Sequence, residues 1–191
     1  MIKLPRLKTK NLAKLTTTTA IPIAIAVMFS TLIILFVGSN AINAYAEQTD
    51  TLNTTKIVNA PKDKVWSIIS NVDKNPDYWP ISIVTNNLKT NDTVEREVTI
   101  PVPPFMDNKA HQIITINPQQ YTVIENQTQG AVTGVKTISL VQAGSDVNET
   151  EISVVWNLDL SKIPGFGKGF AKDGMSNSVN EALNKIANAS K

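Results

Sequence analysis

The sequence contains no cysteine and only one histidine among its 191 residues. Without cysteine the chain can form no disulfide, use no thiolate nucleophile and hold no metal through sulfur. A Ser-His-Asp triad or a histidine-ligated metal site would depend on His111 alone. The phosphate-binding loop, the dinucleotide fingerprint, the kinase motifs and HExxH are missing as well. We therefore expect neither a metal nor a cofactor of the common classes.

Acidic residues are missing from residues 1–46, which carry five basic ones, Lys3, Arg6, Lys8, Lys10 and Lys14. Removing these five from the 18 basic residues of the chain leaves 13, against 16 acidic residues, so the remainder carries about −3. The excess of positive charge thus belongs to the N-terminal segment. Because nucleic-acid binding needs a basic patch on the folded part, no nucleic-acid partner is expected.

The N-terminal segment contains one long hydrophobic run, from Ala20 to Gly38, whose only polar side chains are Ser30 and Thr31. A helix of 19 residues is about long enough to cross a bilayer core of roughly 30 Å. Positive charge before the run predicts that the N-terminus is cytoplasmic and that the rest is exported. Two interpretations stay open. The run is a membrane anchor, or it is a signal peptide cleaved after Ala46, where Ala44-Tyr45-Ala46 resembles a peptidase site.

The remainder is predicted to be a polar linker, 47–53, followed by one domain, 54–191. Five Asn-x-Ser/Thr sequons fit an exported domain and are candidate N-glycan sites: Asn53, Asn91, Asn126, Asn148 and Asn188.

Within the domain, a strand at 56–59 precedes a helix that begins after Pro61, and a short second turn ends at Tyr78, Trp79 and Pro80. Alternation of apolar and polar residues then predicts six strands, at 81–88, 93–102, 110–116, 121–126, 132–141 and 151–160. Hairpin-length connections make this an antiparallel sheet, whose apolar face must be covered. The cover is a C-terminal helix that follows a turn at 163–167, with an apolar stripe of Phe170, Met175, Val179, Ala182, Leu183 and Ile186.

Two segments of this pattern are similar to a known family. Residues 57–66, IVNAPKDKVW, resemble the first strand and the Ala-Pro-x-x-x-Val-Trp helix start of the START-like superfamily, also called SRPBCC, Bet v 1-like or helix-grip. Residues 71–80, NVDKNPDYWP, resemble its aspartate-containing turn before an aromatic-proline stop. The resemblance covers residue 54 to the end, and within the superfamily it points to the polyketide cyclase/dehydrase and lipid-transport group.

The resemblance implies an α+β fold in which a curved seven-stranded antiparallel sheet wraps around the long C-terminal helix, with two short helices after the first strand. It also implies a cavity between sheet and helix that holds an apolar molecule. Residues expected to line the cavity are those whose phase points toward the last helix: Trp66, Ile69, Tyr78, Trp79, Val98, Ile114, Ile138, Trp156, Met175, Val179 and Leu183. Met106 and Phe166, in turns, are candidates for the cavity mouth, together with Phe105.

Catalysis would need an ionisable side chain in the cavity, and two are candidates. Arg96 lies between Val94 and Val98, so if these valines face inward, Arg96 needs a carboxylate or an anionic head group as partner. His111 alternates with Ile113 and Thr115 on its strand, where an ordinary strand position explains it equally well.

Three functions are therefore compatible with the sequence. The leading hypothesis is an exported or membrane-tethered protein that binds a small apolar or amphipathic, lipid-like ligand without catalysis. The second is a cyclase-like enzyme that uses Arg96, His111 or a cavity carboxylate. The third is a surface interaction module without a ligand, which predicts a collapsed cavity and an exposed apolar patch.

Overall fold

The computed structural model of the protein describes residues 49–103 and 106–191. The predicted membrane or signal helix at 20–38, the peptidase-like site at Ala46 and Phe105 lie outside these residues. Within the described ranges, no helix combines the length and the apolarity needed to cross a membrane.

Seven strands form one antiparallel sheet in the order β1-β7-β6-β5-β4-β3-β2. Their bounds are β1 Asp50–Val58, β2 Ser82–Lys89, β3 Thr93–Thr99, β4 Lys109–Asn117, β5 Thr122–Gln129, β6 Thr133–Gln142 and β7 Thr150–Asp159. Between β1 and β2 lie α1 (Lys62–Ile69), a 3-10 turn η1 (Val72–Lys74) and α2 (Asn75–Tyr78), and the chain ends in α3 (Gly165–Ala189). The predicted sheet, the two short helices and the C-terminal helix are confirmed.

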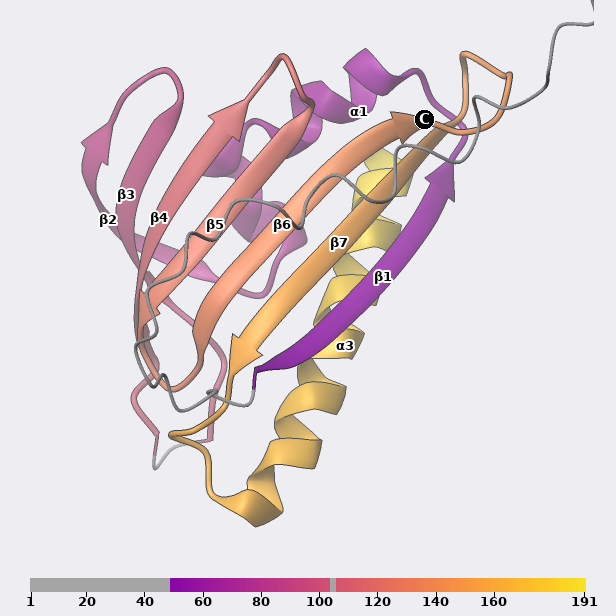
Figure 1. Ribbon diagram of the computed structural model, residues 1–191. Coiled ribbons are helices and arrows are strands. Elements are labelled where there is room, and N and C mark those ends of the chain that lie inside the picture. The colour runs from indigo at the N-terminus through magenta and orange to yellow at the C-terminus, as the bar shows by residue number, and fades with distance from the viewer. Residues whose placement is uncertain (1–48, 104–105) are drawn as a thin grey trace, which may run out of the picture. The chain divides into compact units, whose positions relative to one another are not determined.

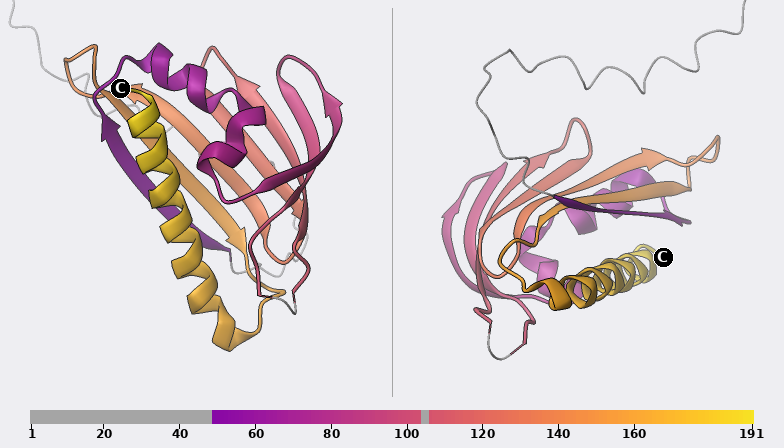
Figure 2. Two further views of the ribbon diagram at one scale, coloured as in Figure 1. Left: turned by 180° about the vertical axis from the view of Figure 1, so that it is seen from behind. Right: turned by 60° about the horizontal axis from the view of Figure 1, so that its bottom comes forward.

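The sheet curves around α3, which lies along its concave side, while α1 and α2 cover the concave side beside it (Figures 1 and 2). The main core fills the space between the sheet, α1 and the second half of α3. It includes Val65 and Ile69 of α1, Ile114 and Ile152 of the sheet, and Leu183 of α3. One end of the domain is therefore densely packed.

Several boundaries differ from the prediction, among them the end of β3 at Thr99 and the end of β5 at Gln129. Strand β1 begins at Asp50, so residues 50–53, predicted to end the linker, pair with Leu158 to Val155 of β7. The polar side chains of this segment hid the strand, because alternate positions of β1 face solvent and backbone pairing does not require apolar residues. Helix α3 begins at Gly165, inside the predicted turn.

The apolar stripe of α3 is also shorter than predicted. Val179, Ala182, Leu183 and Ile186 are buried, but Phe170 is 80% exposed. Phe170 is nine residues from Val179, about 2.5 helical turns, so it points to the opposite side of α3, whereas Ala171 and Met175 pack against a second buried cluster that includes Leu158 and Ile163.

Candidate functional site

A cavity of about 620 Å³ lies between the sheet and the first half of α3. Its walls are mostly apolar and include Ile81, Ile100, Val132, Ile163 and Met175. Val102, Phe166 and Phe170 lie on its rim, and both phenylalanines are largely exposed to solvent. The arrangement gives an apolar chamber that opens at the end of the domain where α3 begins.

The wall on the sheet side carries a buried lysine, Lys136 of β6. Its ammonium lies 4.0 Å from the centroid of the Trp79 ring and 4.9 Å from that of Trp156. Its Nζ also lies 2.8 Å from Oε1 of Glu125 on β5. Two aromatic faces and one carboxylate thus stabilise a cation that also borders the cavity.

Glu125 belongs to a buried polar network on the concave face of the sheet. Gln112 Nε2 donates to Glu125 Oε1 at 3.0 Å and to Gln127 Oε1 at 3.1 Å. Gln127 Nε2 in turn donates to the Val132 carbonyl at 2.7 Å. Gln112, Glu125 and Gln127 all line the cavity, so its inner wall offers polar groups that are already oriented by their own hydrogen bonds.

Arg96 also belongs to this network, through a hydrogen bond to Gln112. It is fully buried, and its Nε donates to Gln112 Oε1 at 3.0 Å. Its Nη1 donates to the Val72 carbonyl of η1 at 2.8 Å, which ties the turn before Trp79 to the sheet. Its Nη2 lies 3.7 Å from Glu125 Oε2 and has no hydrogen-bond partner among the described residues.

The charges of the network do not cancel. Arg96 and Lys136 carry two positive charges and Glu125 one negative, all in buried side chains. Burial lowers the pKa of the Arg96 guanidinium from its ordinary value, whereas the negative charges of Glu125 and Asp73 raise it. Counted at their formal charges, these three buried side chains have an excess of one positive charge.

Sheet register brings these side chains and Trp156 together from five strands. Arg96 is opposite Gln112, Gln112 is opposite Gln127, and Lys136 is opposite both Glu125 and Trp156. Each of them has the phase of the buried apolar residues on its strand, because side chains two positions apart share a face. The polar band therefore runs across the sheet.

Of the eleven residues predicted to line the cavity, Trp79, Trp156 and Met175 do so. The other eight do not border it. Ile69, Ile114, Ile138, Val179 and Leu183 are buried in the main core, Trp66 and Tyr78 pack against that core, and Val98 is buried. Their inward phase was correct, but phase does not tell where along the helix the packed core ends and the cavity begins.

The two ionisable candidates have different positions. Arg96 is buried together with Val94 and Val98, and its carboxylate partner is Glu125. His111 lies on the outer face of the sheet, where its Nδ1 is 2.8 Å from Thr128 Oγ1 and its Nε2 is 3.0 Å from Glu95 Oε1. His111 is thus outside the cavity.

The sequence prediction missed Gln112, Glu125, Gln127 and Lys136. The alternation of the strands contained a signal for two of them, because Lys136 is two residues before Ile138 and Glu125 is two residues after Val123, and both apolar neighbours are buried.

In the described part of the chain, no group of three or more His, Asp or Glu side chains is arranged to hold a metal ion. The five sequon asparagines are all exposed, Asn53 and Asn126 within strands.

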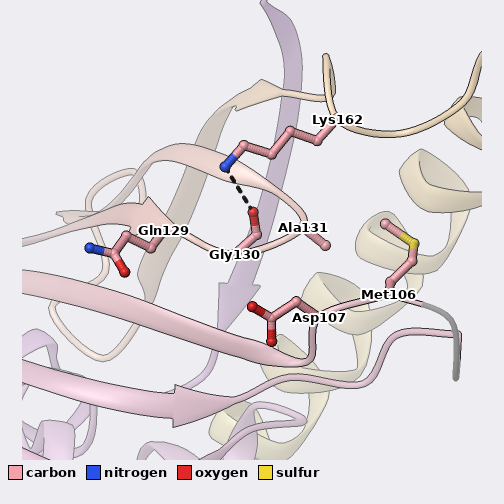
Figure 3. Close-up of a pocket in the computed structure, with 6 residues that line it drawn as sticks. All are labelled: Met106, Asp107, Gln129, Gly130, Ala131 and Lys162. Carbon is pink, nitrogen blue, oxygen red and sulfur yellow. Dashed lines mark hydrogen bonds between the residues drawn. The ribbon is translucent and has the colours of Figure 1, made fainter.

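A second pocket, of about 520 Å³, shares Met106 with the main cavity (Figure 3). Lys162 Nζ donates to the Gly130 carbonyl at 3.2 Å there, and Asp107 lies across the pocket from it (Figure 3). This contact joins the loop after β7 to the turn between β5 and β6, next to the mouth of the main cavity.

The fold is similar to solved structures at low sequence identity. The protein TTHA0849 of Thermus thermophilus gives a TM-score of 0.61 at 12% identity, over 73% of this chain and 96% of that protein. The Zhui aromatase/cyclase from a Streptomyces species gives 0.55 at 14% identity, over 74% of this chain and 90% of that enzyme. The protein XoxI of Bacillus cereus gives 0.55 at 14% identity, over 73% of this chain and 94% of that protein.

Neither a scan of protein-family models nor a search of curated proteins finds a match to the chain. At 12–14% identity, the structural likeness establishes the fold alone.

Proposed function

We propose that this chain, whose fold is the helix-grip fold of the SRPBCC type, binds one small amphipathic molecule between the sheet and α3. The observation that carries the proposal is a cavity of about 620 Å³ with mostly apolar walls and the Lys136 ammonium on its inner wall. Ligand sites in proteins commonly run from roughly 300 to 1,000 Å³ and combine apolar walls with a few fixed polar groups.

The polar network also indicates which end of the ligand lies inside. Because Arg96 and Lys136 exceed Glu125 by one positive charge, an anion or a strong hydrogen-bond acceptor on the ligand would balance the network. A carboxylate or an enolate has this chemistry. The apolar body of the ligand would then extend along Met175 toward Phe166 and Phe170.

The proposal includes the location of the domain. The basic N-terminal segment and the hydrophobic run at 20–38 support export, either with a membrane anchor or, after cleavage behind Ala46, as a secreted protein. A ligand of lipid-like character would be available at that location.

Native mass spectrometry of the gently purified full chain tests the proposal. We expect one bound molecule per chain. In Lys136→Met the occupancy should fall at least about tenfold, because a charge-assisted hydrogen bond to the ligand is lost. Lys185→Met removes an exposed lysine on α3 and serves as the matched control, with unchanged occupancy. No adduct in repeated preparations, or an equal adduct in Lys136→Met, would overturn the proposal.

One observation favours a second function, a cyclase-like enzyme. Glu125 Oε1 and Lys136 Nζ, 2.8 Å apart, are an acid–base pair on the cavity wall, where proton transfer to a bound molecule is within reach. An enzyme of this kind would release a ring-closed product, with loss of water if the new ring dehydrates. Recovery of the bound molecule with unchanged mass and connectivity after prolonged incubation argues for binding alone.

The third hypothesis, a surface module without a ligand, predicted a collapsed cavity. The open cavity contradicts that prediction, whereas the exposed apolar patch that the hypothesis also predicted is present at the cavity rim in Phe166 and Phe170.

A further inference from the structure

The two most exposed large hydrophobic side chains of the described residues are Phe166 and Phe170, at 82% and 80%. They are four residues apart in α3, so they lie on the same face of consecutive turns. Both also line the rim of the cavity. Two exposed phenylalanines on one helix face are costly in water, and such a patch usually marks an interaction surface.

The chain enters the described domain near the same turns of α3, on another face of the helix than the patch. Asp50, the first residue of β1, accepts a hydrogen bond from Lys172 Nζ at 2.9 Å, two residues after Phe170. Only 11 residues, 39–49, separate β1 from the hydrophobic run that ends at Gly38. Fully extended, they span at most about 40 Å. If the run spans a bilayer, Asp50 is therefore held within about 40 Å of the membrane surface, a distance that allows the patch to reach it.

We propose that Phe166 and Phe170, with Gly169 between them, form a docking surface for the phospholipid bilayer, so that the cavity mouth faces the membrane. Phenylalanines of a helix that lies at the interface insert into the boundary between head groups and acyl chains. The inference adds a membrane contact to the proposed ligand binding and does not require the cavity to be occupied.

Charge near the patch is small. Residues 162–173 contain Lys162, Lys168, Lys172 and Asp173, and Lys172 is paired with Asp50. The contact therefore relies on apolar burial. We expect it on neutral phosphatidylcholine, with little change between low and high salt.

The absence of cysteine from the chain allows one label per molecule. Gly169 has no atom within 4 Å of an added Cβ, so we expect Gly169→Cys to be tolerated and to place a fluorophore next to the phenylalanines. Ser145→Cys, in the exposed turn between β6 and β7 at the other end of the domain (Figure 1), carries the control label. The measurement uses the full chain with neutral phosphatidylcholine vesicles that contain a head-group nitroxide lipid as quencher.

We expect quenching of the label at 169 to exceed that of the label at 145 by about twofold or more. The double substitution Phe166→Ser and Phe170→Ser should abolish this difference. Val141→Ser with Val147→Ser removes apolar side chains that are 53% and 67% exposed near the other end and should leave it unchanged. All four positions are exposed, so the variants are expected to keep the melting temperature of the parent.

Equal quenching at both positions, or quenching at 169 that survives the double phenylalanine substitution, would overturn the inference. A concentration-dependent dimer that protects the label at 169 without vesicles, and disappears in the serine variant, would overturn it in favour of a second copy. The experiment does not read cavity occupancy. A negative quenching result therefore does not contradict ligand binding. An empty cavity in native mass spectrometry likewise does not contradict membrane docking.

Discussion

Glu125 is the only negative charge in a buried network with two cations, Arg96 and Lys136. Glu125→Gln keeps the shape of the side chain and an acceptor for Gln112, but it leaves both cations without a carboxylate. Breaking a buried ion pair by removing one partner costs about 3–5 kcal/mol. We expect a loss of this size in the free energy of unfolding, measured by urea denaturation of the ligand-free chain.

A double substitution separates charge from packing. Lys136→Met alone leaves Arg96 and Glu125 balanced, and adding it to Glu125→Gln removes one of the two uncompensated cations. The double variant should therefore be more stable than Glu125→Gln alone. Glu97→Gln, at an exposed position of β3, is the control and should change stability by less than about 0.5 kcal/mol. Equal losses in Glu125→Gln and Glu97→Gln would contradict the buried network.

At the scale of elements, the hydroxyl of Tyr121 ties the start of β5 to α1 by donating to Asp63 Oδ1 at 2.5 Å. This hydrogen bond, with smaller contributions from burial and the negative charge of Asp63, raises the pKa of Tyr121 above its ordinary value. A raised folded-state pKa means that the stabilisation is complete below the unfolded value of about 10 and is lost as pH rises through the folded pKa.

The urea midpoints of the parent chain and Tyr121→Phe should therefore differ at pH 8 and converge above pH 10. If the difference between the two midpoints stays constant to the highest pH at which the chain remains folded, the Tyr121 hydroxyl does not stabilise the contact between β5 and α1.

Strand β6 depends on a glycine at its second residue. Gly134 has φ +134°, and a Cβ there would collide with the carbonyl oxygen of Asn157 on β7. Gly134→Ala should therefore destabilise the chain by about 3 kcal/mol or more. Gly144, at φ +59°, has open space around its Cβ position, so Gly144→Ala should cost only about 1–2 kcal/mol. Similar thermal shifts in the two variants would contradict the close approach at Gly134.

The sequence predicts elements better than the site because the two depend on different information. Alternation along Val94–Val98 and Ile152–Leu160 records which face is buried, and that record was enough for six strands and the phase of Arg96. The partner of Arg96 is set by register across β3, β4 and β5, which no single strand encodes. Phe170, by contrast, is nine residues from Val179, about 2.5 helical turns, so the helical period itself places it on the opposite, exposed side of α3.

At the scale of the molecule, one end is packed and the other is hollow, and α3 passes through both. Its second half buries Val179, Leu183 and Ile186 in the main core. Its first half contains Gly165, Gly167, Gly169 and Gly174 and borders the cavity. Glycine weakens a helix by about 1 kcal/mol per residue relative to alanine, so the first half should open locally more often than the second.

Hydrogen exchange followed by mass spectrometry tests this division. In the ligand-free chain, amides of 165–177 should exchange faster than those of 178–189, and ligand loading should slow the first group only. Uniform exchange along α3, or equal protection of both halves by the ligand, would show that the helix behaves as one unit and that the cavity does not govern its first half.

The most direct test of the account is a crystal structure of the chain with its co-purified molecule. We predict that the polar end of the molecule lies about 3 Å from Lys136 Nζ, between Trp79 and Trp156, and that its apolar body points toward Phe166 and Phe170. A molecule bound in the opposite direction, with its polar end at the mouth, or one bound outside the cavity would contradict it.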